Sequence, residues 1–140
     1  MSGKTFFDTN IFIYANDKHE PVKQSIARDL LREATFDGDG VISDQVMHEF
    51  FNVVLRKAPS KMKPEEAFLF LETVFRPLVA VPSSFSLVSD AIRIQDRYRL
   101  SWYDSLIVAA AQHAGCKLLY SEDLQHDQQF GAVTVKNPFL

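Results

Sequence analysis

Four acidic residues stand far apart in the sequence, and their type suits the binding of a divalent cation. Asp8, Glu49, Asp104 and Asp123 offer only carboxylate oxygens, and the sequence shows no convergent set of histidines or cysteines beside them. Ligation by oxygen alone favours Mg²⁺ or Mn²⁺ over zinc. A cation held in this way can lower the pKa of a bound water and offset negative charge on a substrate. The residue types therefore indicate a metal site, provided that the fold brings the four acids together.

Short apolar runs alternate with helical patterns along the chain. The runs predict strands at residues 4–7, 41–42, 78–81, 117–120 and 133–135. Helical spacing predicts helices that begin at Pro21, at Asp44 (running to about Lys57), at Pro64, near Ser84 and at Trp102 (running to about Ala114). Strands that alternate with helices imply a mainly parallel sheet covered on both faces, which is an α/β fold.

Polar residues follow three of the predicted strands. Asp8 comes directly after the first strand, Ser43 and Asp44 follow the second, and residues 121–123 (Ser-Glu-Asp) follow the fourth. In open α/β sheets, ligands bind beyond the carboxyl ends of the strands, where loops and helix N-termini meet. We therefore expect acids and hydroxyls to gather at this edge of the sheet.

Each acid also has an ordinary structural explanation. Asp8 with its neighbours Thr9 and Asn10 can cap a helix, and residues 121–123 can form a polar turn with a cap. Asp104 stands three residues after Ser101, as in a capping box, and Asp44 can cap its own helix. No single acid decides between a cap and a metal ligand.

Glu49 is harder to explain in this way, because Val46, Phe50 and Val53 place it beside the apolar stripe of its helix. Its carboxylate needs either a Lys or Arg partner or a cation. Two ionised carboxylates about 5 Å apart repel by about 3 kcal/mol at an effective dielectric near 20. If the four acids converge, some must hold protons or a divalent cation must neutralise them. The joint pattern favours the cation.

Other chemistries find less support. His48 and Glu49 begin like the zinc-protease helix motif, but position 52 is Asn and not His. Cys116 is the only cysteine and lies in an apolar run, so we expect a buried, inert thiol and a reducing compartment. A phospho-accepting domain would want paired acids after the first strand, and a hydrolase with an aspartyl phosphate would want Asp at position 10, where Asn10 stands.

Size and charge limit the remaining classes. The 140 residues, 46% of them hydrophobic, suit one compact domain over residues 1–140. The N-terminus reads neither as a signal peptide nor as a membrane span, so we expect a cytoplasmic protein. A formal charge of −3 excludes binding of nucleic acid by bulk charge and leaves local patches. The candidate patches are Arg56, Lys57, Lys61 and Lys63 in one group and Arg93, Arg97 and Arg99 in another.

Four segments resemble the acidic motifs of PIN domains, and in particular those of the toxin subunits of VapBC-type toxin-antitoxin pairs. They surround the four acids in order and at suitable spacing, at residues 7–11, 46–50, 103–107 and 119–124. The resemblance covers essentially the whole chain. It implies a three-layer fold with a mainly parallel central sheet of about five strands flanked by helices.

The resemblance also implies a site and an activity. Asp8, Glu49, Asp104 and Asp123 would bind the metal and carry catalysis, and the supporting hydroxyl and amide groups would be Thr9, Asn10 and Ser121. It implies Mg²⁺- or Mn²⁺-dependent endoribonuclease activity on RNA, homodimerisation, and inhibition by a small cognate antitoxin. It assigns no role to Glu122 or Asp127. The alternative function is a non-catalytic module of the same fold that binds RNA or protein.

Overall fold

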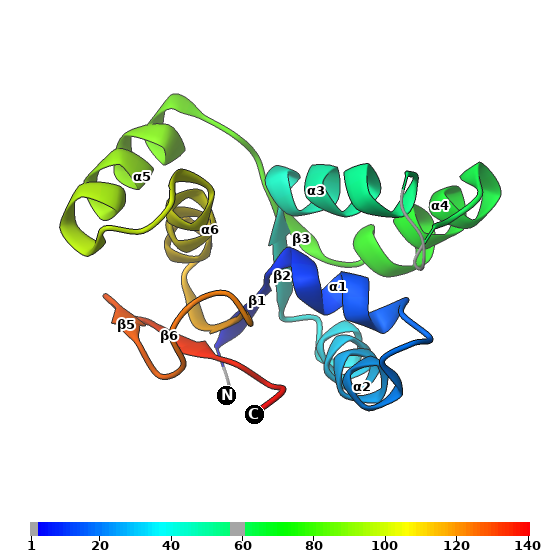
Figure 1. Cartoon of the computed structure of the whole chain (residues 1–140). Coiled ribbons are helices and arrows are strands. Elements are labelled where there is room, and N and C mark those ends of the chain that lie inside the picture. The colour runs from blue at the N-terminus through cyan, green and yellow to red at the C-terminus, as the bar shows by residue number, and fades with distance from the viewer. Residues whose placement is uncertain (1–2, 57–60) are drawn as a thin grey trace.

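The computed structural model describes residues 3–56 and 61–140, and it contains one six-stranded sheet (Figure 1). The strand order is β3-β2-β1-β4-β6-β5, and every neighbouring pair is parallel except β5 with β6. The strands are β1 (Lys4–Phe7), β2 (Gly40–Ser43), β3 (Val79–Val81), β4 (Cys116–Tyr120), β5 (Gln129–Phe130) and β6 (Val133–Lys136). The expected α/β fold with a mainly parallel sheet is confirmed, but the sheet has six strands and not about five. The additional strand is β5, whose two residues are too few to give an alternating pattern.

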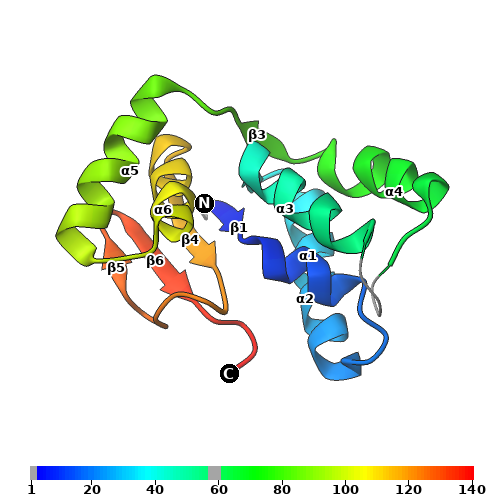
Figure 2. The ribbon, with the colours of Figure 1, turned by 45° about the horizontal axis from the view of Figure 1, so that its top comes forward.

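Helices flank the sheet on two sides. They are α1 (Thr9–Ala15), α2 (Pro21–Asp37), α3 (Asp44–Val54), α4 (Pro64–Phe70), α5 (Phe85–Tyr98) and α6 (Trp102–His113), and the π-helix η1 (Leu71–Phe75) continues α4. Figures 1 and 2 show α1 to α4 on one side of the sheet and α5 with α6 on the other. The order β3-β2-β1-β4 requires this arrangement, because the chain reverses direction along the sheet between β3 and β4 and a right-handed crossover then changes face.

The cap of α3 differs from the sequence expectation. The helix α3 begins at Asp44, but its cap is Ser43, whose Oγ accepts a hydrogen bond from the amide of Val46 at 3.4 Å. It ends at Val54, and the expected terminus at Lys57 lies outside the described residues. The seven-residue helix α1 was expected only as a possible capped helix, and it forms with Asp8 as its cap.

Within the described residues, no helix has the length and apolarity needed to cross a membrane.

A cluster of phenylalanines packs α1 against α3. The ring of Phe12 on α1 lies 6.4 Å from that of Phe50 on α3, and both contact Phe75 of η1 at 4.8 and 5.3 Å. All three side chains are almost completely buried. Such aromatic pairs bury large apolar areas and prefer edge-to-face geometry. Their packing fixes α3 beside the start of α1 and so decides which residues Glu49 meets.

Candidate metal centre

Asp8 lies where β1 ends and α1 begins. Its amide donates a hydrogen bond to the Tyr120 carbonyl at 3.0 Å, so the residue is tied to β4 as well. Asp8 Oδ1 accepts from the amide of Thr9 at 2.7 Å, and Oδ2 accepts from Ser121 Oγ at 2.7 Å. The residue is only 4% exposed. Asp8 is therefore a helix cap and, at the same time, a buried acid at the carboxyl edge of the sheet.

Glu49 comes to the same edge from α3. Its Oε1 accepts from Thr9 Oγ1 at 3.1 Å and from Gln45 Nε2 at 3.0 Å. Gln45 Nε2 also donates to the carbonyl of Tyr103 at 3.2 Å, which joins α3 to the first turn of α6. No Lys or Arg in the described part of the chain forms an ion pair with Glu49. The sequence left two explanations open for Glu49, a basic partner or a cation. The described residues do not supply the basic partner.

Asp104 and Asp123 are held by serine hydroxyls at their backbones. The amide of Asp104 donates to Ser101 Oγ at 3.2 Å, as expected of the first turn of α6. The amide of Asp123 donates to Ser121 Oγ at 3.1 Å. Ser121 thus accepts at the turn and donates to Asp8, which uses both capacities of one hydroxyl. The side chains of Asp104 and Asp123 are more exposed than that of Asp8.

Electrostatic influence links the four acids in a chain. Burial raises the pKa of Asp8 to about 7, hydrogen bonds from Ser121 and Thr9 oppose this, and the charges of Asp123 and Glu49 add to it. Burial also raises the pKa of Asp123, and the charges of Asp104 and Glu122 contribute further. Glu49 and Asp123 both affect Asp8, and Asp104 affects Asp123, so each acid is linked electrostatically to at least one other. The fold therefore brings all four sequence-predicted acids into one electrostatic neighbourhood.

Asn10 lies among these acids with an amide that lacks partners. Both polar atoms of its side chain are buried without a hydrogen bond of standard geometry. The amide is nevertheless close enough to Asp123 to oppose the rise in the pKa of that carboxyl. A buried amide without partners is costly and marks a place where an additional polar group fits. A buried carboxylate, an unsatisfied amide and further carboxylates form a donor set suited to a hard cation.

The side chains do not present a finished coordination shell. Among residues 3–56 and 61–140, no three acidic, histidine or cysteine side chains stand together as a metal-binding group. Asp8 and Glu49 are fixed by hydrogen bonds to Thr9, whereas Asp123 lies on an exposed turn. Closing a shell around a cation would therefore depend mainly on side-chain rotation at Asp104 and Asp123.

A second charged group borders this site. Two of its members, Tyr14 and Lys23, were not among the residues that the sequence pattern indicated. Glu122 Oε1 accepts from Tyr14 Oη at 2.7 Å, and Glu122 Oε2 accepts from Lys23 Nζ at 2.8 Å. Lys23 Nζ also donates to Tyr14 Oη at 3.1 Å. No spacing rule connects residues that are 99 and 108 positions apart. The only sequence signal was the position of Glu122 between Ser121 and Asp123.

The expected basic patches are mostly engaged locally. Arg93 Nη1 pairs with Asp90 at 2.8 Å, and the guanidinium of Arg97 lies 5.3 Å from the centre of the Tyr98 ring. Arg99 ends α5 in the left-handed region, with φ of 57°. The first patch places Arg56 beside Asn52 at 3.3 Å, while its member Lys57 lies outside the described residues. Asp127 contacts Lys136 and His126 and is not linked to the four acids.

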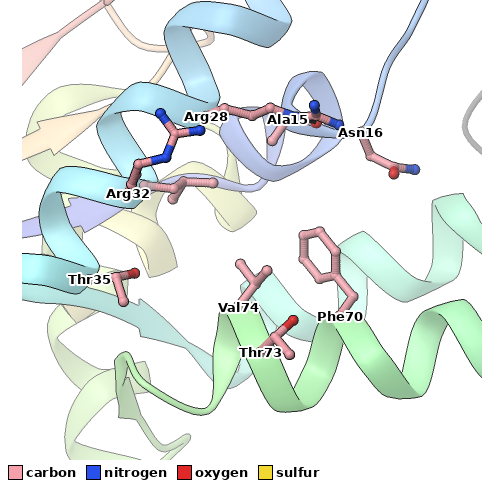
Figure 3. A pocket seen from close by; sticks show the side chains of 9 residues that line it. Ala15, Asn16, Arg28, Arg32, Thr35, Phe70, Thr73 and Val74 are labelled. Carbon is pink, nitrogen blue, oxygen red and sulfur yellow. Dashed lines mark hydrogen bonds between the residues drawn. The ribbon is translucent and has the colours of Figure 1, made fainter.

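Among the cavities of the described residues, one adjoins Glu49 and another is lined by none of the four acids. One of about 350 Å³ adjoins Glu49 and is lined in part by Gln45, His48 and Tyr103. The other, of about 370 Å³, lies between α1, α2 and the segment formed by α4 and η1 (Figure 3). Its lining includes Arg28, whose Nε donates to the Ala15 carbonyl at 2.8 Å, and it contains none of the four acids. Of these two cavities, only the first touches one of the four acids.

The fold and the site together define an α/β protein with a carboxylate-rich centre at the carboxyl edge of a mainly parallel sheet. The sequence pattern of the PIN domain matches residues 5–129. The chain therefore belongs to the PIN domain family. No curated protein is similar enough in sequence to count as a relative.

Solved structures share this fold at low sequence identity. VapC20 of Mycobacterium tuberculosis, described as a toxin that cleaves the sarcin-ricin loop, is 18% identical with a TM-score of 0.66, covering 86% of this chain and 90% of its own. DNA-bound VapBC of Salmonella typhimurium is 16% identical with a TM-score of 0.70, covering 96% and 97%. VapBC2 of Rickettsia felis, bound to a promoter DNA fragment, is 16% identical with a TM-score of 0.68, covering 94% and 96%.

Proposed function

We propose that this protein is a Mg²⁺- or Mn²⁺-dependent endoribonuclease that hydrolyses RNA phosphodiester bonds. The observation that carries the proposal is the buried Asp8, which is only 4% exposed and accepts from the Thr9 amide and from Ser121 Oγ; burial raises its pKa to about 7, and the charges of Asp123 and Glu49 add to the rise. Perturbed carboxyls in a shared site are typical of catalytic and metal-binding centres. Membership of the PIN domain family supports the same interpretation, as does the fold shared with a toxin described as cleaving the sarcin-ricin loop.

Asp8, Glu49, Asp104 and Asp123 would hold the cation, which when bound supplies an activated water and offsets charge on the phosphate. The chain's own groups orient these acids. Ser121 and the Thr9 amide fix the two oxygens of Asp8, and Thr9 Oγ1 with Gln45 fixes Glu49. The buried Asn10 amide would gain the polar partner that it lacks among the described residues. Groups that orient ligands in this way tune the affinity for the metal.

We further propose that the chain is the toxin of a type II toxin-antitoxin pair and works as a homodimer in the cytoplasm. Two of the structurally similar proteins are VapBC complexes bound to DNA, which supports a small antitoxin as the partner. Residues 1–140 would form one nuclease domain, because the family match spans most of that length. Arg93, Arg97 and Arg99 would contact the RNA backbone.

Cleavage of a structured-RNA pool tests the proposal. Purified chain free of antitoxin is assayed with Mn²⁺, with Mg²⁺ and with chelator, beside Asp8→Asn and the matched control Asp29→Asn. Asp29 is an exposed acid that pairs with Arg32 on α2. We expect metal-dependent fragments that disappear in Asp8→Asn and persist in Asp29→Asn. Full activity of a stably folded Asp8→Asn would overturn the assignment, and metal binding without cleavage of any RNA would favour the non-catalytic module.

A further inference from the structure

Tyr14, Lys23 and Glu122 form a closed ring of hydrogen bonds beside the acidic site, and we call it the Lys23 brace. Its three contacts measure 2.7 Å between Tyr14 Oη and Glu122, 2.8 Å between Lys23 Nζ and Glu122, and 3.1 Å between Lys23 Nζ and Tyr14 Oη. Lys23 Nζ also lies 4.5 Å from the centre of the Tyr14 ring. Every polar atom of the three side chains therefore has a partner inside the ring.

The brace joins α1 and α2 to a turn that lies 108 positions from Tyr14 and 99 positions from Lys23. Tyr14 comes from the last turn of α1, Lys23 from the first turn of α2, and Glu122 from the turn after β4. The ring of Phe139 packs against Tyr14 at 4.9 Å, which brings in the C-terminal segment that runs from β6 towards α2 (Figures 1 and 2). Arg28 of α2 donates to the Ala15 carbonyl and fixes α2 against the end of α1. Contacts from α1, α2 and the C-terminal segment therefore support Glu122.

Glu122 stands between the two residues on which the turn depends. Ser121 before it donates to Asp8, and Asp123 after it is one of the four acids. Both carboxylate oxygens of Glu122 accept hydrogen bonds from Tyr14 and Lys23, and the backbone of Glu122 belongs to the turn. The contacts of the Glu122 side chain therefore restrain the backbone that carries Ser121 and Asp123.

We propose that the Lys23 brace positions the turn of residues 121–124, so that Ser121 stays on Asp8 and Asp123 stays in reach of the cation. This inference rests on the proposed function of the site. Tyr14, Lys23 and Glu122 act here as positioning residues. In this proposal they act through the backbone of the turn, and the four acids remain the ligands of the cation.

The brace differs from an ordinary surface ion pair. Lys23 and Glu122 are 32% and 29% exposed, whereas Arg76 and Glu72, which pair on η1, are 68% and 54% exposed. Exposed pairs contribute little because water and salt screen them. The Arg76–Glu72 pair has similar contacts, at 2.6 and 2.7 Å, and none of the four acids is adjacent to it in sequence. It therefore provides a matched control for the loss of an ion pair as such.

The direction in which Lys23→Met changes the affinity for Mn²⁺ separates a positioning role of Lys23 from a role limited to its charge. Lys23→Met removes a positive charge near the acids, so a role limited to charge predicts tighter binding of Mn²⁺. Positioning predicts weaker binding, because Glu122 loses its partner and the turn loosens. Residues that orient metal ligands typically change metal affinity by about 10- to 100-fold, and we expect about tenfold weaker binding. Titration of the full chain with Mn²⁺, followed by electron paramagnetic resonance, measures the affinity.

Two companion variants refine the test. Tyr14→Phe removes one hydrogen bond and no charge, and we expect a smaller weakening in the same direction. Glu72→Gln should leave Mn²⁺ affinity unchanged. In chelator, amide hydrogen exchange at Asp123 and Leu124, whose amides donate to Ser121, should accelerate in Lys23→Met and not in Glu72→Gln. If Lys23→Met does not fold, Tyr14→Phe carries both measurements.

The outcomes distinguish this inference from the proposed function. If the wild type binds Mn²⁺ and cleaves RNA but Lys23→Met binds Mn²⁺ equally well or more tightly, the brace is overturned and the nuclease stands. If the wild type binds no Mn²⁺, both fall together. Weaker binding in Lys23→Met and Tyr14→Phe, with faster exchange at the turn and an unchanged Glu72→Gln, supports the positioning role.

Discussion

Asp8 combines a structural and a chemical role at one position. It caps α1 through its contact with the Thr9 amide, and it is the most buried of the four acids. A cap alone would work equally well at the surface. Burial of the carboxyl instead raises its pKa from 3.8 to about 7. Between these two pH values the folded protein holds a proton on Asp8 that the unfolded chain releases.

This proton makes the stability of the metal-free protein depend on pH. The folded pKa of Asp8 lies above the ordinary value of 3.8, so its contribution is greatest at low pH and is lost as the pH rises towards about 7. We expect the free energy of unfolding in chelator to fall by on the order of 2–3 kcal/mol between about pH 5 and about pH 7.5. Denaturant unfolding at both pH values measures this. Asp8→Asn should flatten the dependence, and an identical slope in that variant would contradict the assignment.

Ser121 offers a second test at the scale of one residue. Ser121→Ala removes the donor to Asp8 and the acceptor for the amides of Asp123 and Leu124, all of which are at least partly buried. Leaving such groups unpaired costs about 1–3 kcal/mol. We expect a loss of that size in denaturant unfolding, together with weaker Mn²⁺ binding. Ser86→Ala, at an exposed position of α5, is the control and should change neither quantity.

The sequence singled out the four acids because Asp8 and Asp123 follow strands, Asp104 lies in the first turn of a helix, and Glu49 lies beside the apolar stripe of α3. Their neighbourhood follows from topology, since parallel strands end at one edge of a sheet. Lys23 and Tyr14 could not be found in this way. Their contacts with Glu122 depend on how α1 and α2 pack, and that packing is not written in any local spacing.

At the scale of elements, α3 is held at its start by two different side chains. Ser43 caps the helix through the amide of Val46, whereas Asp44 Oδ2 accepts from the amide of Ser83 at 3.2 Å, in the segment before α5. The prediction that Asp44 caps this helix was wrong, because its carboxylate reaches a neighbouring loop. Both residue types are good caps, so the sequence alone could not choose between them.

Ser43→Ala tests this division of roles. Loss of an N-cap hydroxyl costs about 0.5–2 kcal/mol, and Ser43 is buried, so we expect a value in the upper part of that range. Asp44→Ala should cost less, because its contact with Ser83 is exposed. Thermal or denaturant unfolding of both variants gives the comparison. A larger loss in Asp44→Ala would show that the acid is the more important anchor of α3.

The elements that the sequence missed are those that tertiary contacts stabilise. The seven residues of α1 are mostly apolar and include the β-branched Thr9, Ile11 and Ile13, a composition that could equally extend a strand. The helix forms because Phe12 packs on Phe50 and Phe75, and because α2 covers its end through Arg28. The strand β5 forms because β6 pairs with it at two positions. Isolated helices and strands this short are marginal, so local patterns predict them poorly.

At the scale of the whole molecule, the net charge of −3 repels RNA unless basic residues are concentrated near the site. The C-terminal end of α5 carries Arg97 and Arg99 and leads within a few residues to Asp104 on α6. Arg99 in the left-handed region is uncommon for a residue other than glycine and fixes the direction of the chain into α6. These two arginines are therefore the best placed to offset the overall charge.

Replacing Arg97 and Arg99 together by alanine tests whether they contact RNA. Each lost phosphate contact should reduce the slope of log affinity against log salt by about 0.7 for a single strand, so the pair predicts a reduction of about 1.4. Anisotropy of labelled RNA in chelator, which prevents cleavage, measures affinity across salt concentrations. Arg32→Ala on α2 is the control, because Arg32 is 74% exposed and pairs with Asp29. If the double variant and the Arg32→Ala control both keep the wild-type salt slope, Arg97 and Arg99 do not contact the RNA backbone. The positive charge that attracts RNA to the acids then lies elsewhere on the molecule.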